Sequence, residues 1–153
     1  MNRHKLRALI ILTLPVIFGF GPCGPIAGGK LSEPVVTEKV TDFRFVQDAD
    51  RCAVEVSSDK PHSVTVNCWA VGNQLYIGCR DCEEKKWSRV IDSNPLVRVR
   101  IAESIYPVKA TRLLDPVAIE RAWNFRLEKY VEDEAVPVPE GYWLFHMGSR
   151  PRG

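Results

Sequence analysis

The chain has 153 residues, of which 45% are apolar, so it is long enough for one domain with a real core and an accessory segment. It carries 21 Lys and Arg against 19 Asp and Glu, a formal net charge of +2. This balance excludes the strongly basic surface typical of nucleic-acid-binding proteins, and no nucleic-acid partner is predicted.

The N-terminal segment predicts insertion into a membrane. An apolar run covers residues 8–20, and no charge follows until Lys30. This uncharged stretch is about long enough to cross a bilayer core of ~30 Å. Basic residues precede it, which places the N-terminus inside and the body outside: Arg3, Lys5 and Arg7. We therefore expect residues 1–29 to be a single-pass anchor in the cell membrane, with the body on the extracytoplasmic (periplasmic) side.

Two other interpretations of this segment stay open. It could be a cleaved signal peptide, because Ala27 and Gly29 are small residues before a cut at Lys30. It could also be a lipoprotein signal acylated at Cys23. The retained anchor is preferred, because the Pro-rich sequence around Cys23 is a poor processing site.

The first half of the body predicts three strands, at residues 52–57, 63–71 and 74–79, which alternate apolar and polar side chains. The dipeptide at 72–73 is a hairpin signal, which places Cys68 opposite Ile77. A turn near Lys60 places Cys52 opposite Cys68. One face then gathers the aliphatic residues and is the expected core: Cys52, Val54, Val56, Val64, Val66, Cys68, Ala70, Leu75, Ile77 and Cys79. The other face carries Glu55, Ser57, Ser63, Thr65, Asn67, Trp69 and Tyr76.

The second half predicts two helices among three more strands. A short helix covers 81–93 and is stopped by Asn94-Pro95. A strand at 96–101 follows, with Arg98 and Arg100 on its solvent face, and then a strand at 105–114 with Tyr106, Val108 and Ala110 on one face.

Asp115 and Pro116 are the N-cap and first residue of the second helix. Its inner stripe consists of Ile119, Ala122, Trp123, Arg126, Leu127 and Tyr130, with Arg126 at the edge. An acidic loop at 131–141 and a closing strand at 142–147 complete the body.

Antiparallel hairpins in this number tend to close into a barrel, because closure removes exposed edges. The expected fold is therefore mainly β with two helices. The expected organisation is a membrane segment (1–29), a linker or extended arm (30–41), a barrel domain (42–147) and a tail (148–153).

The stretch from Ser63 to Asp115 resembles the flavin-binding split β-barrel superfamily, the pyridoxamine-phosphate oxidase-like and deazaflavin-dependent reductase group. The resemblance lies in the hairpin sequence at 72–77, the basic helix ending in Asn-Pro at 85–95, the alternating strand at 97–101 and the strand end at 110–115. The sequence at 28–32, directly after the membrane segment, resembles an anchored, largely uncharacterised branch of the group.

This resemblance implies an antiparallel split β-barrel that forms a homodimer, with FMN or a deazaflavin at the subunit interface. Basic residues around the third strand and the following helix hold the cofactor phosphate in such proteins. The matching positions are Arg80, Lys85, Lys86 and Arg89, and an Arg fork with a Lys and helix-start amides suits a phosphate. The other interpretation of these residues is a solvated helix face, balanced by Glu83 and Glu84.

Four cysteines lie in the body, at Cys52, Cys68, Cys79 and Cys82. An extracytoplasmic location favours disulfides, and cross-strand Cys52 and Cys68 lie within bridging range. Small buried hydrophobic side chains are an equally open interpretation. A zinc site would be crowded on the core face, and no metal is predicted.

No catalytic nucleophile is predicted, and His146 is interpreted as a structural or surface residue. The expected function is an envelope-anchored split barrel acting as a flavin- or deazaflavin-dependent oxidoreductase of unknown substrate. The alternative is a non-catalytic barrel that binds haem, lipid or a partner protein.

Overall fold

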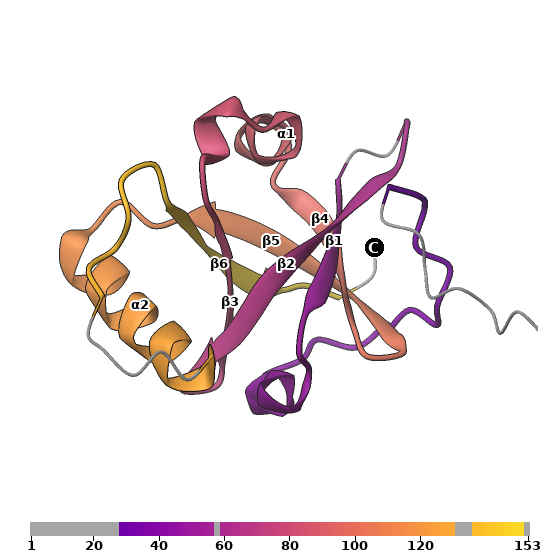
Figure 1. Cartoon of the computed structure of the whole chain (residues 1–153). Coiled ribbons are helices and arrows are strands. Elements are labelled where there is room, and N and C mark those ends of the chain that lie inside the picture. Colours follow the sequence, from indigo (N-terminus) through magenta and orange to yellow (C-terminus); the bar gives the residue numbers. More distant parts are fainter. Residues whose placement is uncertain (1–27, 57–58, 131–135, 152–153) are drawn as a thin grey trace, which may run out of the picture.

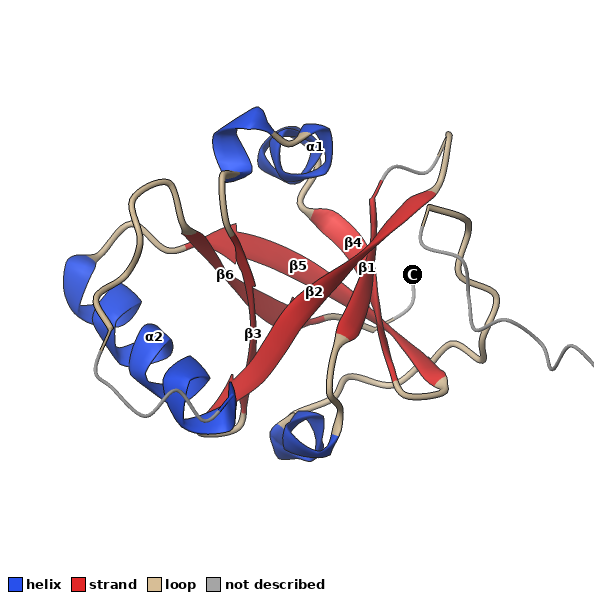
Figure 2. Cartoon of the chain, in the orientation of Figure 1, coloured by secondary structure: helices blue, strands red, loops and turns tan. Residues whose placement is uncertain are grey.

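The structure, a computed structural model, describes residues 28–56, 59–130 and 136–151. Six strands and two α-helices form in these ranges (Figures 1 and 2). The strands are β1 (Cys52–Val56), β2 (His62–Val71), β3 (Gln74–Cys79), β4 (Leu96–Ile101), β5 (Ser104–Arg112) and β6 (Trp143–Ser149). The helices are α1 (Lys86–Ser93) and α2 (Pro116–Tyr130), with 3-10 turns η1 (Arg44–Asp48) and η2 (Cys82–Glu84). The mainly β fold with two helices is confirmed.

Several expectations fall outside the described residues: the hydrophobic segment with Cys23, the strand end at Ser57 and part of the acidic loop. In the part of the chain that is described, neither helix is both long and apolar enough to span a bilayer.

The strands form a closed barrel in the order β1-β2-β3-β6-β5-β4, and every neighbouring pair is antiparallel. β1 and β4 close the ring, with Val54 opposite Val99. The core fills the interior with the expected face of the first three strands, together with Val97, Val99, Val108, Ala110, Phe145 and Met147. The predicted face of the sheet is therefore the inside of the barrel.

The two hairpins differ in how well their register was predicted. Across the Gly72-Asn73 turn Cys68 lies opposite Ile77, as expected. In the first hairpin Cys52 lies opposite Val66, and not opposite Cys68. A shift of two residues keeps every side chain on its predicted face, because side chains alternate with a period of two. Cys52 and Cys68 still bond as a disulfide, with their Cα atoms 5.8 Å apart.

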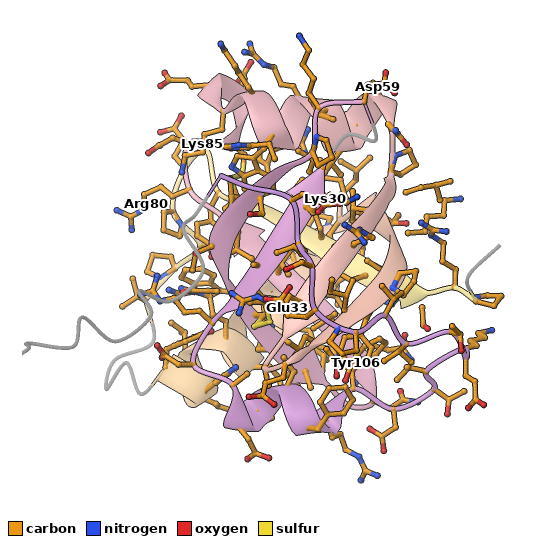
Figure 3. The ribbon with its side chains drawn as sticks, turned by 90° about the vertical axis from the view of Figure 1, so that its right-hand side faces the viewer. Lys30, Glu33, Asp59, Arg80, Lys85 and Tyr106 are labelled. Atoms are coloured by element: carbon orange, nitrogen blue, oxygen red, sulfur yellow. A yellow bond between two sulfur atoms is a disulfide. The ribbon has the colours of Figure 1, made fainter. Side chains whose placement is uncertain are left out.

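The predicted solvent face of β4 is covered, and this expectation was wrong. Residues 28–42 run as an extended arm along the outside of β1, β4 and β5, seen crossing the barrel in Figure 3 with Lys30 and Glu33 on it. Arg98 forms a bidentate ion pair with the buried Glu55, and Arg100 lies 3.4 Å from Glu33. The arm thus partly covers this sheet face and adds ion pairs to it.

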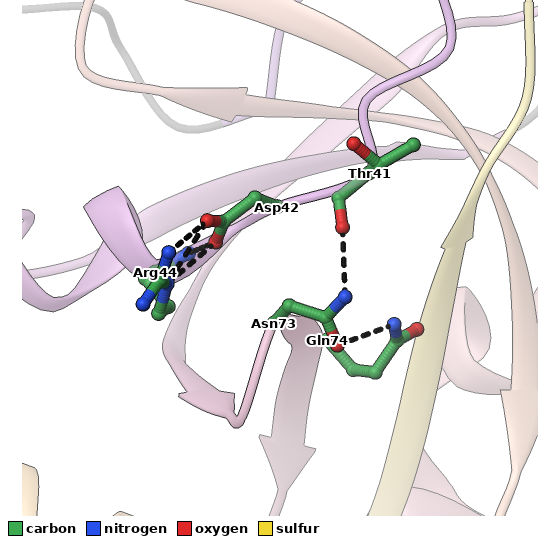
Figure 4. A network of polar contacts seen from close by, with 5 residues as sticks. All are labelled: Thr41, Asp42, Arg44, Asn73 and Gln74. Atoms are coloured by element: carbon green, nitrogen blue, oxygen red, sulfur yellow. Dashed lines mark hydrogen bonds and ion pairs between the residues drawn. The ribbon is translucent and has the colours of Figure 1, made fainter.

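Backbone and side-chain bonds fix the arm in place. Val35 forms a parallel bridge with Ile105, and the Leu31 N–H donates to Glu55 at 2.6 Å. At the far end of the arm, the Asn73 amide donates to the Thr41 carbonyl at 2.9 Å (Figure 4). The β2–β3 turn is therefore attached to the chain that leads into η1.

Helix α2 covers the outer face of β2 and β3 (Figure 1). It begins as predicted, because Asp115 Oδ2 accepts from the Ala118 N–H at 2.9 Å. The buried Trp69 side chain donates from Nε1 to the Ala122 carbonyl at 2.8 Å. Lys129 donates to the carbonyls of Val46, Ala49 and Cys68, and burial lowers its pKa. Helix α2 thereby ties η1 to the sheet.

The first predicted helix is shorter than expected. Asp81 has a φ of 52°, and Lys85 is extended, so only Lys86–Ser93 is α-helical after the short turn η2. Cys79 and Cys82 form a disulfide that closes this connection. A continuous helix from Asp81 is incompatible with that left-handed residue.

Candidate functional site

A cationic cavity of about 340 Å³ lies on the outside of β2 and β3, between η2 and α2. The basic side chains that line it are Arg51, Arg80, Lys85 and Arg126. Its other lining residues are Thr65, Val66, Asn67, Gly78, Cys79, Trp87 and Tyr142, so no carboxylate lines it within the described residues. Four cations in a cavity whose described lining includes no carboxylate form a site suited to an anion.

The basic residues come from three separate parts of the chain. Arg51 precedes β1, Arg80 follows the last residue of β3, Lys85 lies between η2 and α1, and Arg126 is in α2. Arg80 and Lys85 both extend from the same side of the molecule (Figure 3). The site thus depends on the tertiary structure for its charge.

The Cys79–Cys82 connection positions Arg80 and Lys85. The Cys82 N–H donates to the Gly141 carbonyl at 3.4 Å, and the Lys85 N–H donates to the Cys82 carbonyl at 3.2 Å. The buried Ser88 hydroxyl donates to the carbonyls of Cys82 and Lys85. These bonds, with the disulfide, hold the short segment between β3 and α1 against the cavity.

Trp87 and Tyr142 are the aromatic residues that line the cavity, and Arg126 packs against aromatic rings. The Arg126 guanidinium lies 4.5 Å from the centre of the Trp123 ring and 5.8 Å from that of Tyr142. Burial raises the pKa of Tyr142, and the positive charge and hydrogen bond of Arg126 oppose that rise. Tyr142 therefore remains a neutral phenol at physiological pH beside a fixed positive charge.

An acceptor in the cavity wall lacks a donor. Asn67 Oδ1 is buried and has no hydrogen-bond partner among the described residues. A buried polar atom left in this state costs free energy, and a ligand N–H or O–H would satisfy it. The cavity therefore offers cations for an anionic group and an acceptor for a neutral donor.

Gly78 provides room for the Tyr142 ring. A Cβ at this position would overlap Tyr142 Oη and lie 2.7 Å from its Cζ and Cε1 atoms. The ring can lie on the β3 backbone only because residue 78 has no side chain.

We expect Gly78→Ala to lower the free energy of unfolding by about 1–3 kcal/mol, because the added methyl displaces a packed ring. The urea midpoint measures this change. Gly29→Ala is the control, since a Cβ there meets nothing within 4 Å. In a Tyr142→Ala background the cost of Gly78→Ala should shrink, and an unchanged cost would contradict the contact.

The structure brings together two of the four predicted cofactor residues. Arg80 and Lys85 line the cationic cavity. Lys86 lines a neighbouring cavity with Lys85 and Trp87, and Arg89 lines neither. Lys85 has an extended backbone and precedes α1, whereas Lys86 and Arg89 lie on the helix itself, so the three do not form one helical face.

Several lining residues were missed from the sequence. The hairpin register places Thr65 and Asn67 on the outer face of the sheet, and this signal could identify them. The sequence places Arg126 at the edge of the α2 stripe, but nothing local connects it to β3. No local pattern in the sequence marks Arg51 or Tyr142 as a lining residue.

His146 has a structural role, because it contacts neighbouring side chains of β3. Its Nε2 lies 2.8 Å from Gln74 Oε1, its ring centre lies 5.3 Å from that of Tyr76, and burial lowers its pKa. All four cysteines of the body are in disulfides, which decides between the interpretations left open.

Known structures share this architecture at low sequence identity. A candidate 5-nitroimidazole antibiotic resistance protein from Bacteroides thetaiotaomicron is 13% identical, with a TM-score of 0.58 over 68% of this chain and 75% of that one. A candidate pyridoxamine 5′-phosphate oxidase from Listeria innocua is 18% identical, with a TM-score of 0.52 over 68% and 86%. An FAD-binding protein from Mesorhizobium loti is 13% identical, with a TM-score of 0.52 over 69% and 84%.

No family model and no curated protein matches the chain. The structural likeness establishes the fold: the chain is a split β-barrel with the architecture of these known structures. The resemblance seen in the sequence is thereby confirmed at the level of fold.

Proposed function

We propose that this protein binds the phosphate of a flavin-type cofactor, FMN or a deazaflavin, in the cationic cavity and acts as an oxidoreductase. The observation that carries the proposal is the group of four cations, Arg51, Arg80, Lys85 and Arg126, around a cavity whose described lining has no carboxylate. Structural neighbours that are an FAD-binding protein and a candidate pyridoxamine 5′-phosphate oxidase support it.

The residues present fit such a cofactor. An Arg fork and a Lys ammonium supply charge-assisted donors for phosphate oxygens, which suits Arg80 and Lys85 at the cavity mouth. The unsatisfied Asn67 Oδ1 can accept from a hydroxyl or ring N–H of the same molecule. Trp87 and Tyr142 exclude water from one side. When bound, a flavin supplies hydride or electron transfer, for which the barrel provides position and charge.

The expected result of removing the proposed phosphate contacts is a large loss of affinity. Each charge-assisted bond contributes on the order of 1.5–3 kcal/mol, so Arg80→Ala with Lys85→Ala should weaken FMN binding about a hundredfold or more. Flavin fluorescence during titration of the full chain in detergent measures it, with FMN and a phosphate-bearing deazaflavin as ligands.

The matched control is Lys86→Ala with Arg89→Ala, which removes the same charge from α1 outside this cavity. It should leave FMN affinity nearly unchanged. Riboflavin, which has no phosphate, should bind wild type and the Arg80/Lys85 variant equally. The proposal fails if neither cofactor binds wild type, or if the two double variants lose equal affinity.

The proposal places the barrel outside the cytoplasmic membrane, held by residues 1–29. Two disulfides support an oxidising compartment. A reporter fused after Gly153 should be active only if it functions outside the membrane, and a reporter that works only in the cytoplasm should stay silent. Activity of the cytoplasmic reporter alone would reverse the orientation.

The proposal also includes a homodimer, as the fold resemblance implies. Two large apolar side chains, Leu114 just before α2 and Val117 in its first turn, are 77% and 72% exposed and would gain from burial. The molar mass of the purified protein by light scattering tests this assembly.

A further inference from the structure

A second cavity, of about 430 Å³, lies between the β1–β2 hairpin and α1. Val56, Trp87 and Val90 contribute its apolar lining. Its remaining lining residues are Lys60, His62, Lys85 and Lys86, so no carboxylate lines it within the described residues. Lys side chains place their methylene stems on apolar surface and their ammonium groups at its edge, so this site matches an apolar chain with an anionic head.

The described chain begins at the edge of this cavity. His62 Nδ1 lies 3.2 Å from the Gly28 carbonyl oxygen, and a Cβ on Gly28 would lie 3.6 Å from the same imidazole ring. Gly28, the first described residue, therefore lies beside His62. Seven residues separate Gly28 from the apolar run that ends at Phe20, so a membrane that this run enters lies within about 28 Å of the cavity edge.

We propose that this cavity binds an acyl chain of an anionic phospholipid from that membrane, with the lipid phosphate among Lys60, Lys85 and Lys86. The inference rests on the anchoring part of the proposed function; it requires no flavin, although Lys85 lines both cavities. Anionic headgroups attract juxtamembrane lysines, and the attraction falls with salt. The apolar lining supplies affinity for the acyl chain, which charge alone does not give, because it shields acyl carbons from water.

The test uses the full chain in vesicles whose lipids carry bromine on the acyl chains, which quenches nearby tryptophan fluorescence. Brominated phosphatidylglycerol should quench the protein more than brominated phosphatidylcholine. Trp87→Phe should abolish the difference, and Lys60→Gln with Lys86→Gln should reduce it at least twofold. Lys39→Gln with Lys109→Gln removes the same charge outside this cavity and should leave the difference intact.

Several outcomes would overturn the proposal. One is equal quenching by the two lipids, and another is a difference that persists in Trp87→Phe, which would place the contact at another tryptophan. A free fatty acid is the other ligand with an apolar chain and an anionic head, and a brominated fatty acid added to unbrominated phosphatidylcholine tests it. Saturable, Trp87-dependent quenching by that acid, without quenching by phosphatidylglycerol, would assign the cavity to a free fatty acid.

If Trp87→Phe fails to fold, the Lys60/Lys86 variant and its Lys39/Lys109 control still test the proposal. FMN titration of the Lys60/Lys86 variant separates the two hypotheses, because neither residue lines the cationic cavity. Loss of lipid quenching with intact FMN binding supports the lipid site, whatever the outcome at Arg80.

Discussion

Val66→Asp is expected to unfold most of the protein, whereas Thr65→Asp leaves it folded. Val66 points into the barrel and is 6% exposed, while Thr65, its neighbour on β2, is exposed to solvent. An unpaired carboxylate in the core costs several kcal/mol, comparable to the whole stability of a small domain. Urea denaturation with the disulfides kept oxidised measures both variants.

The pair of variants also tests the face assignment of β2. A shift of one residue would exchange the positions of Val66 and Thr65. If Thr65→Asp unfolded the barrel and Val66→Asp did not, the interior face would be the opposite one. Because Thr65 lines the cationic cavity, Thr65→Asp should weaken FMN binding while stability is kept.

Glu55→Ala is expected to lower the free energy of unfolding by on the order of 3 kcal/mol. The Glu55 carboxylate is 7% exposed and accepts from Arg98 Nε at 2.8 Å and from the Leu31 N–H at 2.6 Å. Removing the Glu55 carboxylate leaves the largely covered Arg98 guanidinium without its counter-charge and removes the acceptor that holds Leu31 of the arm. Breaking a covered ion pair by removing one partner is costly, because the other charge stays without compensation. The midpoint of urea denaturation measures the loss.

The control for this prediction is the exposed pair of Arg44 and Asp42, whose side chains are 75% and 42% exposed. Arg44→Ala should leave the midpoint unchanged, because water screens an exposed pair. A double replacement, Glu55→Leu with Arg98→Met, should recover much of the loss. Equal shifts in Glu55→Ala and Arg44→Ala would show that the arm contributes little to stability.

The sequence predicted the fold wherever local chemistry was sufficient. Alternation along residues 52–79 identified the interior face of the barrel, and the two-residue turn at Gly72 and Asn73 set the β2–β3 register. A tight turn leaves little freedom in pairing. The longer connection before His62 leaves more freedom, and there the predicted register was off by two residues.

The candidate site was predicted in part. Arg80 and Lys85 follow β3 closely in sequence, so their position relative to that strand was accessible. Charges adjacent in sequence resemble a cluster, which groups Lys86 and Arg89 with them, but these two residues lie on α1, beyond the extended Lys85, and do not line the cationic cavity.

By itself, then, the sequence determined the strands, the interior face and the α2 cap, because turns, alternation and capping act between residues close along the chain. The tertiary structure decided what covers the outer face and what meets there. Arg98, which the sequence pattern places on the solvent face, pairs with Glu55 under the arm. Cys52 and Cys68 form a disulfide because the barrel brings them together. The cationic cavity exists because Arg51, Arg126 and the end of β3, distant in sequence, converge when the barrel closes and α2 packs on it. Such convergence depends on long-range packing, which no local pattern encodes.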